Sequence, residues 1–196
     1  IKDSRFISIY KLMLADSDGA NEKVLLSSSE PIISPSWSPD GKRVAYVSFE
    51  TGIAKVFIQE IASGKREAVL SQGTQISSPS WSPDGAQIAF HSDRDGNNQI
   101  YVMNADGTNP TNISNNDDSD KSPSWSLDGS RIGFASSRNI VIVDPQIYTM
   151  NADGTNQAEI AYDSNFGAPS ADAQNFDPAW SPVVYVGIDP DDPEAP

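Results

Sequence analysis

The most constraining feature of this 196-residue chain is the pattern Ser-Pro-Ser-Trp-Ser-Pro-Asp-Gly, which returns at a constant distance. Its tryptophans are Trp37, Trp81 and Trp125, so the period is 44 residues; the third copy has Leu127 in place of the second proline. A period of about 40 to 45 residues is that of one four-stranded β-propeller blade. The pattern therefore predicts an all-β chain built from repeated antiparallel blades.

Each repeat shows the same order of strand signals after its tryptophan. An Asp-Gly turn is followed by a small apolar triplet, which is Val44–Tyr46 in the first repeat and Ile88–Phe90 in the second. A third strand and a second turn come next, and this turn reads Asn-Ala-Asp-Gly-Thr-Asn at residues 104–109 and again at 151–156. A fourth, more polar strand ends the unit. Since Asp-Gly suits the positive φ angles of tight hairpin turns, we interpret these aspartates as structural residues and not as ligands.

The tryptophans have a structural interpretation as well, because large aromatic side chains can fill the space between neighbouring blades. We predict that role for four residues: Trp37, Trp81, Trp125 and Trp180. Trp180 belongs to a fourth, altered copy, Asp-Pro-Ala-Trp-Ser-Pro, which lacks the Asp-Gly turn.

The N-terminal residues 5–28 fit the later strands of a blade. Asp18 precedes Trp37 by 19 residues, the interval that also separates the aspartate of the 104–109 turn from the next tryptophan. One long strand is predicted over Arg5–Leu14 and another around Val24–Leu26. With the fourth tryptophan copy near the C-terminus, these strands complete a blade that is split between the two ends.

The fold prediction is thus a β-propeller with three whole blades and one split blade, over residues 1–188. It is either a closed four-bladed ring or part of a larger propeller, because an open arc leaves strand edges unpaired. Residues 189–196 are acidic and rich in proline, and are predicted to be a tail or a linker stub.

Composition excludes several classes of function. The formal net charge of −14 repels phosphate backbones and anionic membrane surfaces, so neither nucleic-acid binding nor membrane insertion is expected. The chain has no cysteine, and His91 is its single histidine, which excludes thiolate chemistry and a multi-histidine metal centre. We interpret His91 as a structural residue. No cofactor is predicted; calcium stays an alternative because residues 116–120 and 189–192 supply hard oxygen ligands without EF-hand spacing.

One face of the predicted blades concentrates the length variation. Loops between the second and third strands of a blade lie on the same face as the connections between blades, opposite the Asp-Gly turns. From the second to the third repeat, both expansions, of 3 and 8 residues, fall on this face. Binding loops on rigid scaffolds concentrate in this way, so we predict a partner-binding site here. Its candidate residues are Asp93, Arg94, Asp95, Asn97, Asp117, Asp118, Asp120, Arg138, Asp144, Asp163 and Phe166.

The coincidence of Trp-Ser-Pro-Asp-Gly, Ile-Ala-Phe and Asn-Ala-Asp-Gly-Thr-Asn resembles the repeats of the TolB β-propeller family, over roughly residues 5–182. The resemblance implies a bacterial protein in the periplasm or outside the cell. It also implies closure by the strand with Ala179-Trp180-Ser181-Pro182. Members usually have six or so blades, whereas this sequence is expected to hold three whole blades and one split blade, and the separate N-terminal domain of TolB itself is not expected here.

These features favour a non-enzymatic, exported propeller that binds another protein through its acidic, loop-rich face, and the partner is expected to be basic. A second hypothesis is a structural subunit that associates with itself into an oligomer or an extracellular filament. A third is an accessory propeller of an enzyme that processes polysaccharide or peptide.

Overall fold

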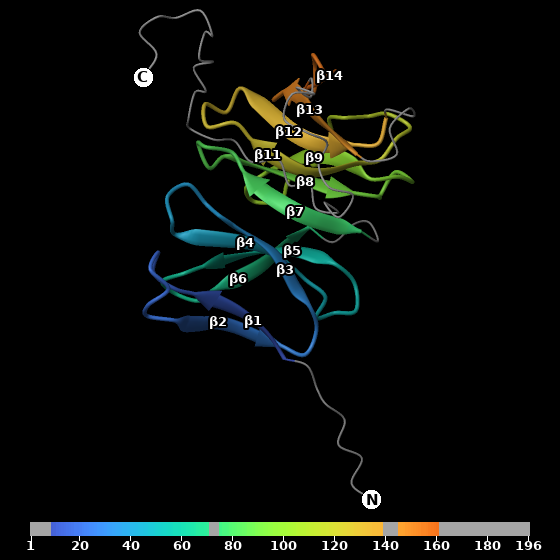
Figure 1. Ribbon diagram of the computed structural model, residues 1–196. Coiled ribbons are helices and arrows are strands. Elements are labelled where there is room, and N and C mark those ends of the chain that lie inside the picture. Colours follow the sequence, from blue (N-terminus) through green and yellow to red (C-terminus); the bar gives the residue numbers. More distant parts are fainter. Residues whose placement is uncertain (1–8, 71–74, 139–144, 161–196) are drawn as a thin grey trace, which may run out of the picture.

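The computed structural model describes residues 9–70, 75–138 and 145–160, and these residues form fourteen strands (Figure 1). The strands make three four-stranded antiparallel sheets and one two-stranded sheet. Each four-stranded sheet takes its strands in chain order, as a propeller blade does. The predicted all-β architecture of repeated blades is confirmed. In the part of the chain that is described, no helix is long and apolar enough to cross a membrane.

The blades follow the 44-residue repeat. Blade one contains β3 (Ile32–Trp37), β4 (Arg43–Ser48), β5 (Lys55–Glu60) and β6 (Arg66–Leu70). Blade two contains β7 (Ile76–Trp81), β8 (Gln87–Ser92), β9 (Gln99–Asn104) and β10 (Thr111–Asn112). Blade three contains β11 (Asp120–Trp125), β12 (Arg131–Ser136), β13 (Gln146–Asn151) and β14 (Ala158–Glu159).

The two-stranded sheet is the N-terminal hairpin of β1 (Tyr10–Leu14) and β2 (Lys23–Ser28). It confirms the later strands of the split blade; residues 5–8 of the predicted long strand lie outside the described residues. The C-terminal half of that blade and the 189–196 tail also lie outside them. Figure 1 shows the hairpin at one end of the stack of blades and blade three at the other.

The innermost strands share a bend that follows from their Ser-Pro-Ser sequence. Ser34, Ser78 and Ser122 each have a φ of 52°, and the pairing with the next strand shifts register at this point in every blade. Positive φ is uncommon outside glycine, so its recurrence shows that the bend belongs to the repeat. Strand β7 contacts both β3 and β11, which gathers the three bends near one another.

Side-chain hydrogen bonds hold the Asp-Gly turns, as their structural interpretation predicts. In blade three, Ser126 Oγ donates to Asp128 Oδ1 at 2.7 Å, and the backbone N–H of Ser130 donates to the same oxygen at 3.0 Å. The serine-to-aspartate bond recurs at 2.6 Å between Ser38 and Asp40. The aspartate therefore closes the turn that its glycine makes sterically possible.

Apolar cores lie between neighbouring blades. Trp81 and Phe90 of blade two pack with Val56 of blade one, and Trp125 of blade three packs with Ile100 of blade two. Both tryptophans are only 7% exposed. These two side chains therefore lie between neighbouring blades.

Trp37 differs, and its predicted place between blades stays a prediction. Its side chain is 49% exposed. On that side of blade one the described residues comprise only the hairpin, whose Leu12 packs with Tyr46 and Phe57. A hairpin supplies only the outer half of a blade, so the inner strands that would face Trp37 are missing from the described part of the chain. Trp180 lies outside that part too.

The second turns of blades two and three each make a close backbone contact with the preceding blade. An ideal Cβ placed on Gly107 would lie 2.2 Å from the carbonyl oxygen of Val69, and one on Gly154 would lie 2.4 Å from that of Ile113. Only glycine permits this approach. This contact gives a physical reason for the identical Asn-Ala-Asp-Gly-Thr-Asn turns.

Candidate functional site

The face predicted to bind a partner is organised by hydrogen bonds between its loops. We call it the loop face; its described part comprises residues 93–98, 115–121 and 137–138. Asn97 Nδ2 donates to the carbonyl oxygens of Asn116 at 3.2 Å and Asp118 at 2.7 Å. These bonds join the second-to-third strand loop of blade two to the connection that leads into blade three.

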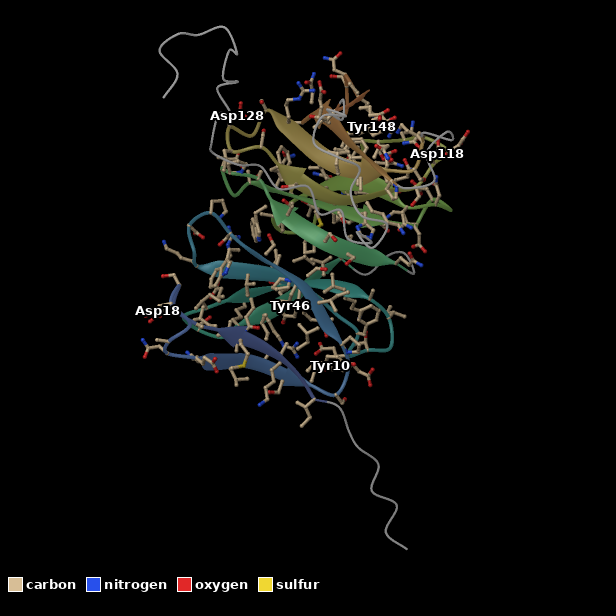
Figure 2. All side chains as sticks on the ribbon, viewed as in Figure 1. Tyr10, Asp18, Tyr46, Asp118, Asp128 and Tyr148 are labelled. Atoms are coloured by element: carbon tan, nitrogen blue, oxygen red, sulfur yellow. The ribbon has the colours of Figure 1, made fainter. Side chains whose placement is uncertain are left out.

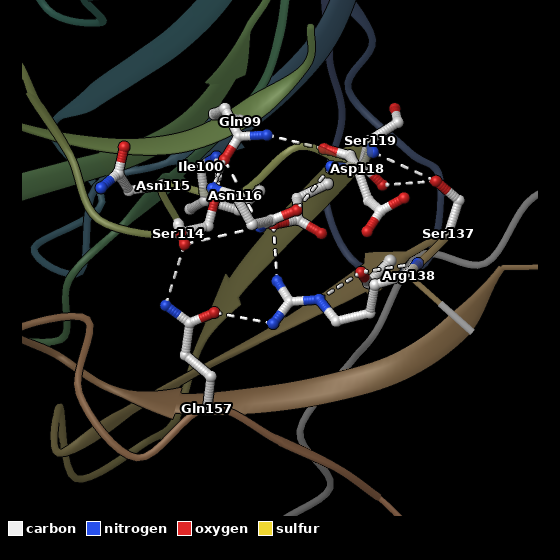
Figure 3. Close-up of polar contacts among 12 residues, drawn as sticks. Gln99, Ile100, Ser114, Asn115, Asn116, Asp118, Ser119, Ser137, Arg138 and Gln157 are labelled. Carbon is white, nitrogen blue, oxygen red and sulfur yellow. Dashed lines mark hydrogen bonds and ion pairs between the residues drawn. The ribbon is translucent and has the colours of Figure 1, made fainter. Parts of the chain in front are cut away.

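Gln99 is the buried centre of the same network. Its Nε2 donates to the carbonyl oxygen of Asp118 at 2.6 Å, and its Oε1 accepts bonds from Ser114 Oγ at 2.8 Å and from the backbone N–H of Asn116 at 2.9 Å. Gln99 is 1% exposed. Figure 3 shows it above the 114–119 loop, whose backbone it fixes.

Asp120 and Arg138 form an ion pair below this loop. Arg138 Nη2 donates to Asp120 Oδ2 at 2.8 Å, and Asn116 Nδ2 donates to the same oxygen at 2.6 Å. Arg138 Nη1 also donates to Gln157 Oε1 at 2.8 Å, so one guanidinium joins three segments of blade three (Figure 3). Asp120 is 0% exposed, and the prediction that it faces a partner is therefore corrected: it is a buried anchor of the loop.

The two predicted arginines lie over aromatic rings of their own blades. The guanidinium carbon of Arg94 is 4.6 Å from the ring centroid of Tyr101 and 5.4 Å from that of Phe90. Arg138 lies 4.7 Å from the ring of Tyr148. Such stacking contributes to stability. Arg94 and Arg138 therefore cap the blade cores with their charged groups instead of extending into solvent.

Two of the predicted aspartates also hold the loops. Asp93 Oδ1 accepts a bond from the backbone N–H of Gln75 at 2.8 Å, which ties the loop of blade two to the start of that blade. Asp95 Oδ2 accepts a bond from the Tyr101 hydroxyl and one from Asn112 Nδ2 at 3.4 Å. Burial raises the pKa of Tyr101, and its bond to Asp95 raises it further.

The carboxylates that the loop face offers to a partner are those of Asp95 and Asp117, which are exposed, and Asp118, which is half-buried. Figure 2 shows Asp118 and Asp128 at opposite edges of blade three, so the loop face and the Asp-Gly turns are separate surfaces. The predicted site residues Asp144, Asp163 and Phe166 lie outside the described residues.

Sequence reasoning missed two features. First, an arginine lies over aromatic rings in each of blades one, two and three. In blade one, Glu50 occupies the loop position of the arginine, and Arg66 of β6 supplies the guanidinium instead. Arg66 Nη1 lies 2.8 Å from Glu50 Oε2. Second, the Ser-Pro-Ser segments of the three blades line a shared depression of about 240 Å³. Both features have a counterpart in the repeated sequence. The aromatic residue that ends each apolar triplet corresponds to the first, and the repeated Ser-Pro-Ser corresponds to the second.

His91 has the structural environment that its isolation in the sequence predicted. It is 8% exposed, and its Nδ1 accepts a bond from the backbone N–H of Ser122 at 3.4 Å. This bond links blade two to the bend of blade three. Over residues 9–70, 75–138 and 145–160, no group of three or more His, Cys, Asp or Glu side chains could hold a metal ion.

Comparison with known proteins gives consistent matches. The family model of the TolB beta propeller domain matches residues 2–183. The Tol-Pal system proteins TolB of Xanthomonas campestris pv. campestris (strain B100) and Xylella fastidiosa (strain M12) are each 58% identical over 57 residues. That segment is 29% of this chain and 13% of each relative. The chain thus matches a small part of the length of these relatives.

Solved structures agree over a longer stretch. TolB from Acinetobacter baumannii superposes with a TM-score of 0.70 at 34% identity, over 78% of this chain and 38% of that one. A putative TolB from Agrobacterium tumefaciens gives 0.70 at 27% identity, over 76% of this chain and 55% of that one. An oligogalacturonate lyase in complex with manganese gives 0.60 at 16% identity, over 76% of this chain and 47% of that one; this likeness shows the fold alone.

Proposed function

Because this chain belongs to the TolB β-propeller family, whose domain model matches residues 2–183, we propose that it is a non-enzymatic, exported propeller that binds another protein through the loop face. The proposed compartment is the periplasm, which the family resemblance implies. The proposed partner belongs to a Tol-Pal system, because relatives of the chain are named as Tol-Pal system proteins.

The observation that carries the proposal is that hydrogen bonds and an ion pair hold the 115–119 loop in place. Gln99 and Asn97 fix its backbone from one side, and the buried Asp120–Arg138 pair fixes it from the other. A loop held in this way loses little conformational entropy when it binds. It presents Asp117 and Asp118 in a fixed arrangement on a rigid scaffold.

The charge of the chain supports a basic partner. With a net charge of −14, long-range attraction speeds the encounter with a positively charged surface and slows that with a negative one. The non-enzymatic part of the proposal is supported by His91, whose ring is buried and whose Nδ1 accepts a backbone bond.

The test is the association rate of this chain with purified proteins of the Tol-Pal system, measured by biolayer interferometry at low salt. We expect binding to at least one of them, and a several-fold slower association for the double variant Asp117→Asn/Asp118→Asn. The matched control is Glu22→Gln/Glu67→Gln, which changes the net charge equally at exposed positions outside the loop face.

Two results would contradict the proposal. Absence of binding to every Tol-Pal protein tested would contradict the proposal that the partner belongs to a Tol-Pal system. Equal slowing by both double variants would show that total charge matters and the loop face does not.

A further inference from the structure

The Asp-Gly turns of blades two and three meet the preceding blade in the same way. An ideal Cβ on Gly85 of blade two would lie 3.6 Å from Cδ of Pro39 in blade one. One on Gly129 of blade three would lie 3.6 Å from Cδ of Pro83 in blade two. The backbone therefore brings both pairs of blades together with the same geometry. A difference between the two pairs at equivalent positions comes from their side chains.

Such a difference occurs at the first residue of the strand after the turn. Strand β4 begins with Arg43 and strand β8 with Gln87, and the backbone N–H of each donates at 2.9 Å to the first serine hydroxyl of its own turn. The guanidinium carbon of Arg43 lies 4.6 Å from the ring centroid of Trp81 in the next blade. Gln87 holds the equivalent position near Trp125 of blade three with a neutral amide. The second pair of blades therefore receives no guanidinium from this position.

A cavity of about 360 Å³ lies at this place between blades two and three. We call it the blade 2–3 cavity. It is lined by Gln87 and Trp125 and by the aspartates of two Asp-Gly turns, Asp84 and Asp128. Both aspartates are exposed, and the hydroxyl of the turn serine lowers the pKa of each, so both are charged at neutral pH. An aromatic ring and two carboxylates around one cavity suit a cation.

Arg43 shows which cation this arrangement accepts. Its guanidinium lies over Trp81, and it also acts on the turn aspartate of its own blade. The pKa of Asp40 is lowered by the Ser38 hydroxyl, by the backbone N–H of Lys42 and also by the charge of Arg43. The planar guanidinium stacks on an aromatic ring and donates to carboxylates at its edge, which the ammonium of lysine does less well. The equivalent cavity between blades two and three therefore suits arginine.

The sequence favours a source of this arginine outside the chain. Of the residues outside the described ranges, only Lys2 and Arg5 are basic. They precede the hairpin, which lies at the end of the stack opposite blade three (Figure 1). Residues 161–196, which follow blade three, include no lysine, arginine or histidine. The net charge of −14 attracts a basic partner.

We propose that the blade 2–3 cavity binds the guanidinium of an arginine side chain from a partner protein, against Trp125 and near the carboxylates of Asp84 and Asp128. Figure 2 shows Asp128 and Asp118 at opposite edges of blade three, so this cavity and the loop face are separate surfaces. The proposal therefore stands or falls independently of binding through the loop face.

The test is an NMR titration of the isotope-labelled chain with N-acetylarginine amide at low salt. The indole N–H signal of Trp125, assigned by its absence in Trp125→Phe, should shift and saturate. N-acetylcitrulline amide, in which a neutral urea replaces the guanidinium, should shift it several-fold less. Asp84→Asn should weaken arginine binding by roughly two- to fivefold, the range for an exposed ion pair. A Gly-Gly-Arg-Gly-Gly peptide should bind at least as tightly as the single amino acid, because the proposed source is a protein.

The most direct variant is Gln87→Arg, which gives blade two the residue that blade one has in Arg43. It should fill the cavity from within the chain and abolish the arginine-dependent shift. The matched control is Ala68→Arg, which adds the same charge at an exposed position of β6 and should bind like the unmodified chain. Thermal melts show whether each variant is folded.

Three results would overturn the guanidinium site: no saturable shift in the unmodified chain, an equal response to arginine and citrulline, or undiminished binding by folded Gln87→Arg. Binding of the free amino acid without binding of the peptide would overturn the protein source and assign the cavity to a small guanidinium compound.

Discussion

At the scale of single residues, the repeated tryptophan contributes differently to stability in different blades, because a neighbouring blade covers some copies more than others. Trp81 is 7% exposed, and the guanidinium carbon of Arg43 lies 4.6 Å from its ring centroid, whereas Trp37 is 49% exposed. We expect Trp81→Ala to lower the free energy of unfolding by about 3 to 5 kcal/mol, and Trp37→Ala to lower it clearly less. Urea denaturation of both variants measures this. Equal losses would show that Trp37 is covered in solution.

The turn aspartates predict a dependence of stability on pH. The bond from Ser126 Oγ, with those from Ser130, lowers the pKa of Asp128 from the usual 3.8 to about 2. A lowered native pKa stabilises the fold above the unfolded value, and this contribution is lost as the pH falls from about 4 towards 2. The stability difference between the unmodified chain and Asp128→Asn should therefore be constant above pH 4 and shrink below it. Denaturation midpoints across this range test the prediction, with Asp117→Asn as the control.

At the scale of structural elements, the turns between the third and fourth strands of blades two and three hold each of them against the blade before it. Gly107 and Gly52 have nearly equal φ angles, of +84° and +82°, but only Gly107 meets the neighbouring backbone. Gly52→Ala should cost about 1 to 2 kcal/mol of stability, from backbone strain alone. Gly107→Ala should cost more, because its Cβ would force the blades apart. Chemical denaturation of these two variants measures the contribution of the contact between blades. Equal losses of stability would show that the Gly107 contact does not hold the blades together.

The Asp120–Arg138 ion pair anchors the 115–119 loop of the loop face. Asp120 is fully buried and the Arg138 side chain is 18% exposed, so removal of the carboxylate leaves a largely buried charge without its partner. We expect Asp120→Ala to destabilise the chain by about 3 to 5 kcal/mol. It should also speed hydrogen exchange of the amides in residues 115–119. Asp117→Ala, at an exposed position of the same loop, should do neither.

At the scale of the whole molecule, the charge of −14 predicts how partner binding responds to salt. Binding of a basic partner through the loop face should weaken as salt rises, because screening removes the attraction. Interferometry over a salt series measures this response. Binding that stays constant or strengthens with salt would contradict a basic partner.

Sequence reasoning located the loop face but not the parts played by its residues. Asp117, Asp118 and Asp120 lie within four consecutive residues, yet Asp117 is exposed and Asp120 is fully buried. The difference arises because Asp120 opens β11 and turns inward to Arg138, which stands two residues after the paired strand β12. No local pattern distinguishes a buried carboxylate from an exposed one when its partner comes from another strand.

The sequence by itself determined the repeat unit, the order of its strands, the structural nature of its Asp-Gly turns and the place of the loops. These follow from short-range rules of turn geometry and from a fixed period. Only the tertiary structure decided which tryptophans are covered, which acids are anchors, and that Gly107 and Gly154 touch the backbone of the preceding blade. Burial depends on which blade lies alongside, and that is a property of the arrangement of repeats and not of any one copy.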